Sequence, residues 1–566
     1  MKKNIFHFFS NSKCNPFVIG IGLLAVPTFS ILIVSLLFIC GLSVNPFVFP
    51  LSLILSLLLM YFVQGKNHKE FLVSVTYHLL IIAFSIIVSV LIYDYSYDGL
   101  AYHQEAIFYL KNGWNPIYEH LPSNATFAIW VEHYAKGMET ISATLYSTTG
   151  NIEAGKAVNF ILIFASAFLF FYFLKTYYGK LSFKKKILLT FLFTLCPVVV
   201  VQILTFYIDF AAYSLLLILV PSLICFLQGD SKYDIYIICF VVVLSATIKF
   251  NLFFWVLFIL FLYTIYAIVL KKYQLLKKMI NVCVLSGIFS VFVAGFNPYV
   301  TNTIDHKNPF YPLMGTDRVD IMTGLANPNF FQKSRFEKVI ISLFSLPNNS
   351  KNEEIKLALP HFLKTSHFER YASVDTRIGG FGIFFSWIFI LSLILLIVDA
   401  FSSKKGVGKN KKPIYCFLGI LFASLFVLPH AWVARYFPFF YAFPLIILLY
   451  SECATQSRVV KVLKSLIYLL LMINTVLFCG AVSVRGYLHK TKVNKSINTL
   501  AKSNNPILIY FGNNVGLKIK LDKRNIPYEA TQEELGTQLT IVGSPYGSFD
   551  STKYIEKNNI LIEKKQ

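Results

Sequence analysis

Residues 94–116, DYSYDGLAYHQEAIFYLKNGWNP, gather acids, tyrosines and a histidine directly after an apolar run. Because side chains four, seven and eleven places apart share one face of an α-helix, a polar stripe is predicted here from Asp98, Tyr102, Glu105 and Tyr109. A carboxylate in such a stripe can act as a general base toward an acceptor hydroxyl. Alternatively, Asp98 only caps a helix that ends at Gly113, since Asp is a favoured N-cap residue. The segment alone favours the cap, because Asp is common at that position, and the rest of the chain shifts the balance toward the site.

The opposite face of the same helix is predicted to be apolar. It carries Leu100, Ile107 and Leu110, and the preceding apolar run covers residues 72–93. A helix of this kind can lie along a membrane surface with its apolar side in the lipid. We therefore expect an amphipathic helix whose carboxylates point toward molecules at the level of the lipid headgroups.

The composition is typical of a multi-pass membrane protein. Of the 566 residues, 56% are hydrophobic and only 14% are charged, and the mean hydropathy is +0.63. No soluble fold could bury so much apolar surface. The net charge of +23 does not indicate nucleic-acid binding, because the lysines gather between apolar segments, a pattern that orients membrane proteins. The nine cysteines fall mostly inside apolar runs and show no disulfide or zinc spacing.

Apolar runs of the length that crosses a bilayer recur along the chain. With roughly 20 residues for each crossing, about thirteen spans are predicted. They lie near residues 17–40, 46–64, 72–93, 157–178, 187–206, 208–228, 234–250, 251–270, 279–298, 378–400, 413–429, 437–450 and 464–483. The first run is too long for the core of a signal peptide and is expected to remain as a span. With a cytoplasmic N-terminus, the basic residues fall in the cytoplasmic connections, which supports the count.

This topology divides the chain into a transmembrane domain, residues 1–483, and a C-terminal domain, residues 484–566. The extracytoplasmic segments are the C-terminal domain and residues 94–156 and 299–377. In the C-terminal domain, ILIYFG (507–512) and QLTIVG (538–543) are typical of buried strands, with a turn and a helix between them at 525–536. The predicted fold is an all-α polytopic membrane protein with extracytoplasmic amphipathic helices and a small extracytoplasmic α/β domain.

Ionisable residues at the ends of the predicted spans indicate a common site, since charges near lipid are costly and usually functional. At the extracytoplasmic side these are Asp94, Asp98, Asp209, Lys249, His306 and Arg435. A simpler interpretation is that Lys249 and Arg435 each extend their charged ends to the membrane–water interface without forming a common site, and that Asp209 pairs with either. Convergence of both charge signs on one face instead predicts a site for a lipid-phosphate donor. Cations would hold the phosphate, and a carboxylate would act as the base.

Residues 98–103, DGLAYH, contain the pattern Asp-x-x-x-Tyr-His. Other short motifs follow at Tyr207–Asp209, Lys249, Asn308–Pro312 and Arg435–Pro438. Together these residues resemble the GT-C superfamily of integral-membrane glycosyltransferases, in particular bacterial members related to the aminoarabinose transferase and the protein O-mannosyltransferases. The alternative motif of that superfamily, Asp-Glu-x-x-Tyr, is broken here because Gly99 stands in place of the second acid. The resemblance covers most of residues 70–450.

The resemblance implies inverting transfer of one sugar from a polyprenyl-phosphate donor to a hydroxyl of a glycan, lipid or protein. The reaction would take place on the extracytoplasmic side of the plasma membrane. Asp98 would be the general base, with Asp94 as its rival. The implied substrate-binding residues are Tyr102, His103, Glu105, Asp209, Lys249, His306 and Arg435.

Within that set, Lys249 and Arg435 would contact the donor phosphate, with His306 a weaker candidate. Glu105 with Asp98 could bind a divalent ion, as in some GT-C relatives. No complete ligand set is visible in the sequence, so metal dependence stays open and no other cofactor is assigned.

Two other classes of membrane protein share part of this pattern. A lipid-linked oligosaccharide polymerase or ligase has many spans, large outer loops and functional arginines, but usually lacks the acidic motif of Asp98 and Tyr102. A transporter or flippase places charges near the midplane and often shows paired repeats, whereas this chain has its charges at one boundary. We therefore rank a glycosyltransferase first, a polymerase second and a transporter third.

Overall fold

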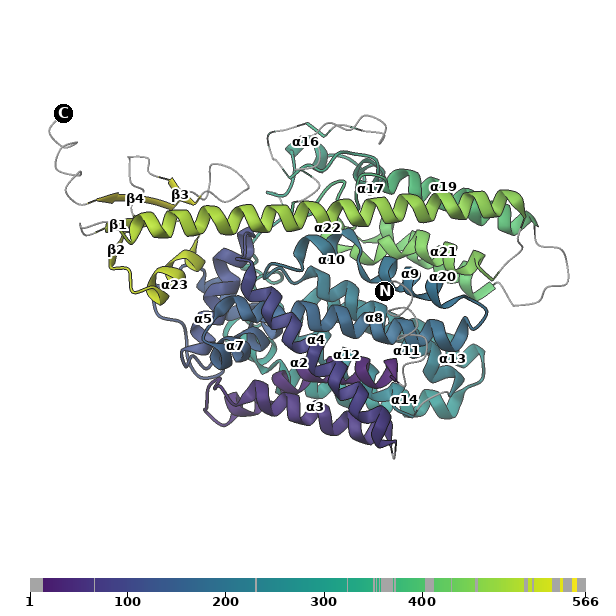
Figure 1. The fold of residues 1–566 in the computed structure, drawn as a ribbon, viewed down its shortest axis with the longest axis horizontal. Coiled ribbons are helices and arrows are strands. Elements are labelled where there is room, and N and C mark those ends of the chain that lie inside the picture. The colour runs from purple at the N-terminus through teal and green to yellow at the C-terminus, as the bar shows by residue number, and fades with distance from the viewer. Residues whose placement is uncertain are drawn as a thin grey trace, which may run out of the picture.

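The computed structural model (Figure 1) shows a mostly helical chain with one small sheet close to its C-terminal end. Most of the long helices run in roughly the same direction, as in a membrane-spanning bundle. Residues 14–556 are described, apart from 66, 230–231, 323, 350–351, 353, 356, 358–369, 371–372, 403–411, 429, 454–456, 503–506, 512–513, 532–539 and 543–551.

The bundle consists of two sets of apolar helices. The first set is α2 (Pro16–Ile39), α3 (Val48–Gln64), α4 (His68–Leu91), α8 (Ala157–Tyr177), α9 (Phe183–Thr194), α10 (Pro197–Gln202), α11 (Asp209–Gln228), α12 (Asp234–Ile248), α13 (Phe250–Val269) and α14 (Tyr273–Phe289). The second set is α19 (Phe385–Ser402), α20 (Lys412–Val427), α21 (Ala442–Ser451) and α22 (Arg458–Leu500).

Short helices form the segments that connect some of these long helices. After α4 come η1 (Gly99–His103), α5 (Gln104–Lys111), α6 (Ala128–His133), α7 (Gly137–Thr149) and η2 (Ile152–Lys156). After α14 come η3 (Ser290–Ala294), η4 (Phe296–Val300), α15 (Thr301–His306), α16 (Pro328–Phe331) and α17 (Arg335–Leu343). Two single turns, η5 (Ala434–Tyr436) and η6 (Pro438–Tyr441), precede α21.

Seven helices in the described part of the chain are long and apolar enough to cross a membrane. They are α2, α4, η2 with α8, α11, α13, α14 with η3, and α22. Five more apolar helices are shorter, with 10–17 residues each. The prediction of a helical membrane protein is confirmed at this level, and the seven full-length candidates stand against the thirteen spans that the sequence predicts.

The predicted span at 187–206 is not one helix. Proline lacks an N–H donor, and its ring clashes with the preceding turn, so Pro197 ends the first piece and begins α10. Residues 203–208 then lie outside any helix before α11 begins at Asp209. This break brings Gln202 beside Asp209, with Gln202 Nε2 donating to Asp209 Oδ2 at 3.1 Å.

The N-terminal helix α2 forms the centre of the bundle because it is apolar on all sides, which is typical of a buried helix. Glycines allow its neighbours to approach closely. A Cβ on Gly20 would lie 2.6 Å from Leu169 Cγ of α8, and one on Gly22 would lie 2.5 Å from Met60 Sδ of α3. By contrast, α13 and α14 leave large apolar side chains exposed along their lengths, as expected for lipid-facing helices.

The last helix, α22, is longer than the membrane is thick. Its 43 residues span about 64 Å at 1.5 Å per residue, roughly twice the hydrocarbon core of a bilayer. The predicted domain boundary between residues 483 and 484 falls inside this continuous helix. In Figure 1, α22 runs across the whole bundle and ends beside the C-terminal sheet. The C-terminal domain is therefore carried on a helix that begins in the transmembrane domain.

The C-terminal domain has a four-stranded sheet in the order β2-β1-β4-β3. Its strands are β1 (Ile507–Tyr510), β2 (Tyr528–Thr531), β3 (Thr540–Val542) and β4 (Thr552–Glu556). β1 and β2 are parallel and are connected through α23 (Val515–Lys523), while β4 is antiparallel to both β1 and β3. The helix thus comes before 525–536. The predicted turn and helix there is wrong at 528–531, which form β2, and residues 532–536 lie outside the described part.

Candidate active site

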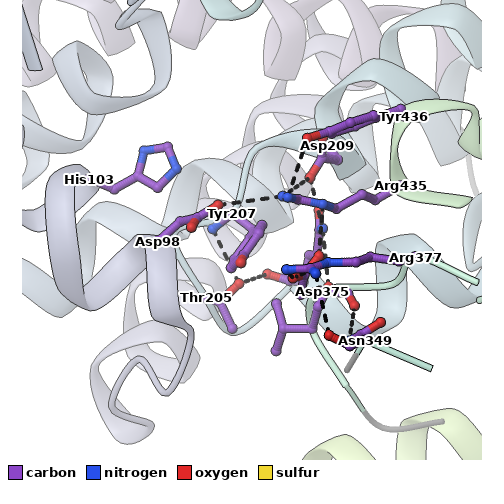
Figure 2. A network of polar contacts seen from close by, with 12 residues as sticks. Asp98, His103, Thr205, Tyr207, Asp209, Asn349, Asp375, Arg377, Arg435 and Tyr436 are labelled. Atoms are coloured by element: carbon purple, nitrogen blue, oxygen red, sulfur yellow. Dashed lines mark hydrogen bonds and ion pairs between the residues drawn. The ribbon is translucent and has the colours of Figure 1, made fainter. Parts of the chain in front are cut away.

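Arg435 lies among carboxylates from three distant parts of the chain (Figure 2). Its Nη1 is 3.4 Å from Asp98 Oδ2 and 3.5 Å from Asp209 Oδ2. Its Nε is 2.9 Å from Asp375 Oδ1, an ion pair that lacks hydrogen-bond geometry. The η5 turn that carries Arg435 is fixed to the 376–377 segment, because the Arg435 backbone N–H donates to Thr376 O at 3.0 Å.

Lys249 completes the group from the side of α12 and α13. The chain is extended at this residue, between the end of one helix and the start of the next, and Lys249 Nζ pairs with Asp209 Oδ1. Asp209 is the first residue of α11, where the positive end of the helix dipole favours a carboxylate. Its side chain is 1% exposed, so Asp209 acts as a buried partner for both cations.

Asp375 is held from the other side by Arg377. Arg377 donates to Asp375 Oδ2 through Nε at 2.8 Å and lies 2.6 Å from it through Nη2. Burial alone would raise the pKa of Asp375, but Arg435 and Arg377 outweigh burial and lower it. The carboxylate is therefore ionised at neutral pH and anchors both guanidinium groups.

The six charged side chains of this site balance. Three carboxylates (Asp98, Asp209 and Asp375) face three cations (Lys249, Arg377 and Arg435), which leaves no formal net charge. Their exposure differs, however. Asp98, Lys249 and Arg377 have side chains that are 19%, 22% and 17% exposed, against 12% for Asp375, 10% for Arg435 and 1% for Asp209. Asp98, Lys249 and Arg377 therefore form the accessible edge of the site.

Aromatic rings surround the cations. The Arg435 guanidinium lies 5.2 Å from the ring centroid of Tyr207 and 5.0 Å from that of Tyr436, and Lys249 Nζ lies 4.9 Å from Tyr436. Tyr102 and Tyr134 meet edge-on with centroids 6.2 Å apart. Burial raises the pKa of Tyr102 well above its ordinary value, so its hydroxyl stays protonated and can donate a hydrogen bond.

The chain directly after Asp98 is kinked and does not form the regular α-helix that the sequence predicts. The backbone of η1 leaves helical geometry at Ala101, with ψ −109°, before α5 begins at Gln104. Consequently the four residues of the predicted stripe do not share one regular face. Asp98 also makes no side-chain capping hydrogen bond, so the capping alternative is not what the structure contains.

Gly99 has a steric reason to stand where the resembled family has a second acid. A Cβ at this residue would collide with Asp94 Oδ2 and Ser96 Oγ. The turn before η1 is compact because Asp94 Oδ1 accepts hydrogen bonds from Ser96 N at 2.9 Å and Ser96 Oγ at 2.7 Å. A side chain at Gly99 would therefore displace the turn that leads to Asp98.

The rival base, Asp94, is fully buried and engaged elsewhere. Besides Ser96, its carboxylate faces Gln104 Nε2 at 3.4 Å. Burial raises the pKa of Asp94, although Lys156 opposes this. Asp94 and Asp98 are four residues apart but lie in different surroundings. Of these two acids, Asp98 is the one whose described contacts include Arg435.

His103 and Glu139 form a buried pair beside the site. His103 Nδ1 contacts Glu139 Oε1, and the two side chains are 3% and 6% exposed. The ring centroid of His103 lies 4.2 Å from that of Tyr102 and 6.5 Å from that of Tyr207. A carboxylate on one ring nitrogen fixes the orientation of an imidazole, and so leaves the other nitrogen for the site.

Glu105 and His306 do not join the charges around Arg435. The two carboxylate oxygens of Glu105 accept the backbone N–H groups of Thr126 and Phe127, each at 2.8 Å, which is a structural use of the acid. His306 stacks on Tyr311 with ring centroids 3.6 Å apart and meets the edge of His133. The amphipathic helix expected here is thus buried on the side of Glu105 as well as on its apolar side.

The described side chains include no complete set of metal ligands. Among them, no group of three or more His, Cys, Asp or Glu residues could hold a metal ion. Glu105, which the sequence pairs with Asp98 as possible ligands, has both oxygens on backbone N–H groups. The charged groups instead suit a bound anion, with cations supplied by Lys249 and Arg435.

Three partners of the predicted residues were missed from the sequence: Glu139, Asp375 and Arg377. Asp375 and Arg377 lie in the polar 299–377 segment, where charged residues are common and hydropathy gives no signal. Glu139 lies in α7, a helix with a polar composition. The pattern Asp-x-Arg at 375–377, directly before an apolar run, is the one signal that could have indicated the first two.

A search of protein-family models, of curated proteins and of solved structures finds nothing that matches this chain.

Proposed function

We propose that this protein is a membrane glycosyltransferase of the GT-C type, which transfers a sugar from a polyprenyl-phosphate donor to a hydroxyl acceptor. One observation carries the proposal: Asp98 and Arg435, 337 positions apart in the chain, meet in one partly exposed site together with Lys249 and Asp209. The carboxylate can act as a base toward the acceptor hydroxyl, and the two cations can bind the leaving phosphate.

In the proposed reaction, Asp98 removes the proton of the acceptor hydroxyl while that oxygen attacks the anomeric carbon of the sugar. The bond between this carbon and the phosphate oxygen breaks, and the electron pair leaves with the phosphate. Arg435 and Lys249 stabilise the negative charge that develops there. Because the acceptor attacks opposite the leaving group, the configuration at the anomeric carbon is inverted.

The donor phosphate replaces existing contacts in this mechanism, since the site already balances its charges. The longest ion pairs of Arg435 are those from Nη1, at 3.4 Å to Asp98 and 3.5 Å to Asp209. Asp209 is buried with Lys249, whereas Asp98 stands at the accessible edge. A phosphate that takes over Arg435 Nη1 therefore releases Asp98 for its role as base.

A lipid-linked donor fits the surroundings of Lys249. Phe250 follows it at the start of α13, and one turn further Phe254 is 49% exposed on the outer face of that helix. Phe310 contacts both rings, with centroids 5.6 Å from Phe250 and 5.2 Å from Phe254. This aromatic row extends from the cation to the lipid-facing side of the bundle, where a polyprenyl chain would lie.

The test is the loss of one sugar in the variant Asp98→Asn. Lipid-linked and surface glycans are compared by mass analysis between cells with the wild-type protein, with Asp98→Asn and with the matched control Asp305→Asn, an exposed residue of α15. We expect the glycans of cells with Asp98→Asn to lack a single sugar although the protein level is normal. The glycans of cells with Asp305→Asn should be unchanged. A full glycan in Asp98→Asn would remove this residue from the mechanism, and a collapse of chain length would favour the polymerase.

The proposal also places the site on the extracytoplasmic side of the plasma membrane, with a cytoplasmic N-terminus. A cysteine introduced in place of exposed Tyr118 should react with a membrane-impermeant maleimide in intact spheroplasts. Reaction only after the membrane is opened would place the site on the cytoplasmic face, where a donor on the outer leaflet could not reach it.

A further inference from the structure

A second cluster of buried charges connects the C-terminal domain to the segment that carries Asp98. Lys520 Nζ of α23 lies 3.0 Å from Glu153 Oε1, and its side chain is only 11% exposed. Glu153 Oε2 also lies 2.7 Å from Lys156 Nζ and accepts the backbone N–H of Asp94 at 3.1 Å. The C-terminal domain thus supplies one cation to a network that ends on the backbone of Asp94.

The network continues from Asp94 into η1. Asp94 binds both the backbone N–H and the hydroxyl of Ser96, and Ser96 O accepts the backbone N–H of Leu100 at 3.0 Å. Asp98 lies inside this short stretch. Its backbone is therefore fixed on both sides by contacts that begin at Glu153.

Steric contact between α23 and η1 adds a second constraint. Gly516, in the first turn of α23, approaches so closely that a Cβ there would be 2.5 Å from Gln104 Oε1 and 3.0 Å from Leu100 Cδ2. Gln104 in turn faces Asp94 through its Nε2. Further along α23, Ile519 belongs to the same apolar cluster as Ala106, Ile107 and Leu110 of α5. The helix thus meets the segment through charge, shape and apolar contact.

We propose that α23 of the C-terminal domain positions the general base: Lys520 and Gly516 hold the turn and the kinked segment η1 that present Asp98 to Arg435. This inference rests on the proposed function. Neither residue touches the reacting atoms, so both are positioning residues. A displacement of about 1 Å in a reacting group can reduce a rate by on the order of 10²-fold, so the contact controls turnover without binding substrate.

The first test uses the full chain with Lys520→Met, Lys520→Arg and Gly516→Ala, and with Lys495→Met as the matched control on an exposed face of α22. Hydrogen exchange of peptides from residues 94–111 reports the order of the segment without any need for activity. We expect faster exchange there in Lys520→Met and Gly516→Ala, and wild-type exchange in Lys520→Arg and Lys495→Met. Wild-type exchange in both Lys520→Met and Gly516→Ala, in folded protein, would overturn the inference.

The second test measures sugar transfer by the same variants. We expect kcat to fall by about 10- to 100-fold in Lys520→Met, with a much smaller change in the KM for the donor, and to recover in Lys520→Arg. A merely structural contact would lower the amount of folded protein and leave kcat per folded molecule unchanged, which would also overturn the inference. If Asp98→Asn transfers sugar as well as wild type does, the proposed function has failed, and the exchange rates alone decide whether α23 fixes the segment.

Discussion

Replacement of Arg435 by methionine should destabilise the protein because its guanidinium links three carboxylates. In Arg435→Met, Asp375 keeps Arg377 and Asp209 keeps Lys249, so the site retains three negative and two positive charges. One negative charge is then left without a counterpart among side chains that are mostly buried. The missing contacts are the 2.9 Å pair with Asp375 and the longer pairs with Asp98 and Asp209.

The magnitude follows from this burial. Arg435 is 10% exposed, and its partners Asp375 and Asp209 are 12% and 1% exposed. Removal of one partner from a buried ion pair costs about 3–5 kcal/mol, and Arg435→Met should lie at the lower end because the carboxylate left without a cation, Asp98, is 19% exposed. The double variant Arg435→Met with Asp98→Asn again has equal numbers of both charges, because it removes that carboxylate. We expect it to be more stable than Arg435→Met by about 1–3 kcal/mol, the usual coupling energy of residues in contact.

The assay is chemical unfolding of the purified protein in detergent, with Arg318→Met as an exposed control. The expected order of stability is wild type and Arg318→Met, then the double variant, then Arg435→Met. Sugar transfer should stay absent in the double variant, since it regains charge balance but lacks both the base and the cation for the phosphate. A double variant no more stable than Arg435→Met would refute the charge balance of this site, and restored transfer would refute the roles of both residues.

Four further changes test other parts of the site and its surroundings. Lys249→Met should raise the KM for the donor by about 10- to 100-fold, because a charged hydrogen bond contributes about 1.5–3 kcal/mol; steady-state kinetics at varied donor concentration measures this. Glu139→Gln should lower kcat in steady-state kinetics, since His103 loses the carboxylate that holds its ring through Nδ1. Glu105→Gln should cost about 1.5–3 kcal/mol of unfolding free energy but preserve transfer per folded molecule, because this acid binds only backbone N–H groups. Burial lowers the pKa of Lys136 from 10.5 to about 7 despite Glu139 and Glu132, so between these values the unfolded chain binds more protons than the folded protein. Stability contributed by this site should therefore rise with pH by at most about 1.4 kcal/mol per unit, and Lys136→Met should remove that rise in unfolding curves at pH 7 and pH 9.

Hydropathy alone predicted where most long helices lie, because a run of apolar residues has few alternatives to a helix in lipid. The predicted runs at 17–40, 72–93 and 208–228 correspond to α2, α4 and α11 within a few residues. A charge near lipid is costly, so charged residues at the ends of apolar runs also indicate the site. The structure brings together four such residues: Asp98, Asp209, Lys249 and Arg435.

Other features depend on contacts that no local pattern encodes. The predicted stripe assumed 3.6 residues per turn, but the close packing of Gly99 on Asp94 and of Gly516 on Gln104 accompanies a kink at Ala101 that changes which side chains share a face. Asp375 lies in a polar segment whose sequence does not distinguish it from other aspartates. Asp375 belongs to the site because it lies 2.9 Å from Arg435, and hydrogen bonds between η5 and the 376–377 backbone set that distance.

In the proposed reaction, the division of the acids by exposure explains how a site without net charge can bind the phosphate. Asp209 and Asp375 are buried with their own cations, so they hold Lys249 and Arg435 at fixed places. Asp98 contributes the third negative charge through a 3.4 Å contact at the accessible edge. An incoming phosphate can replace this contact more readily than either buried one, because Asp98 is less desolvated than the buried acids. The residue that the phosphate displaces is then the one that must accept a proton, so donor binding and activation of the base become the same event.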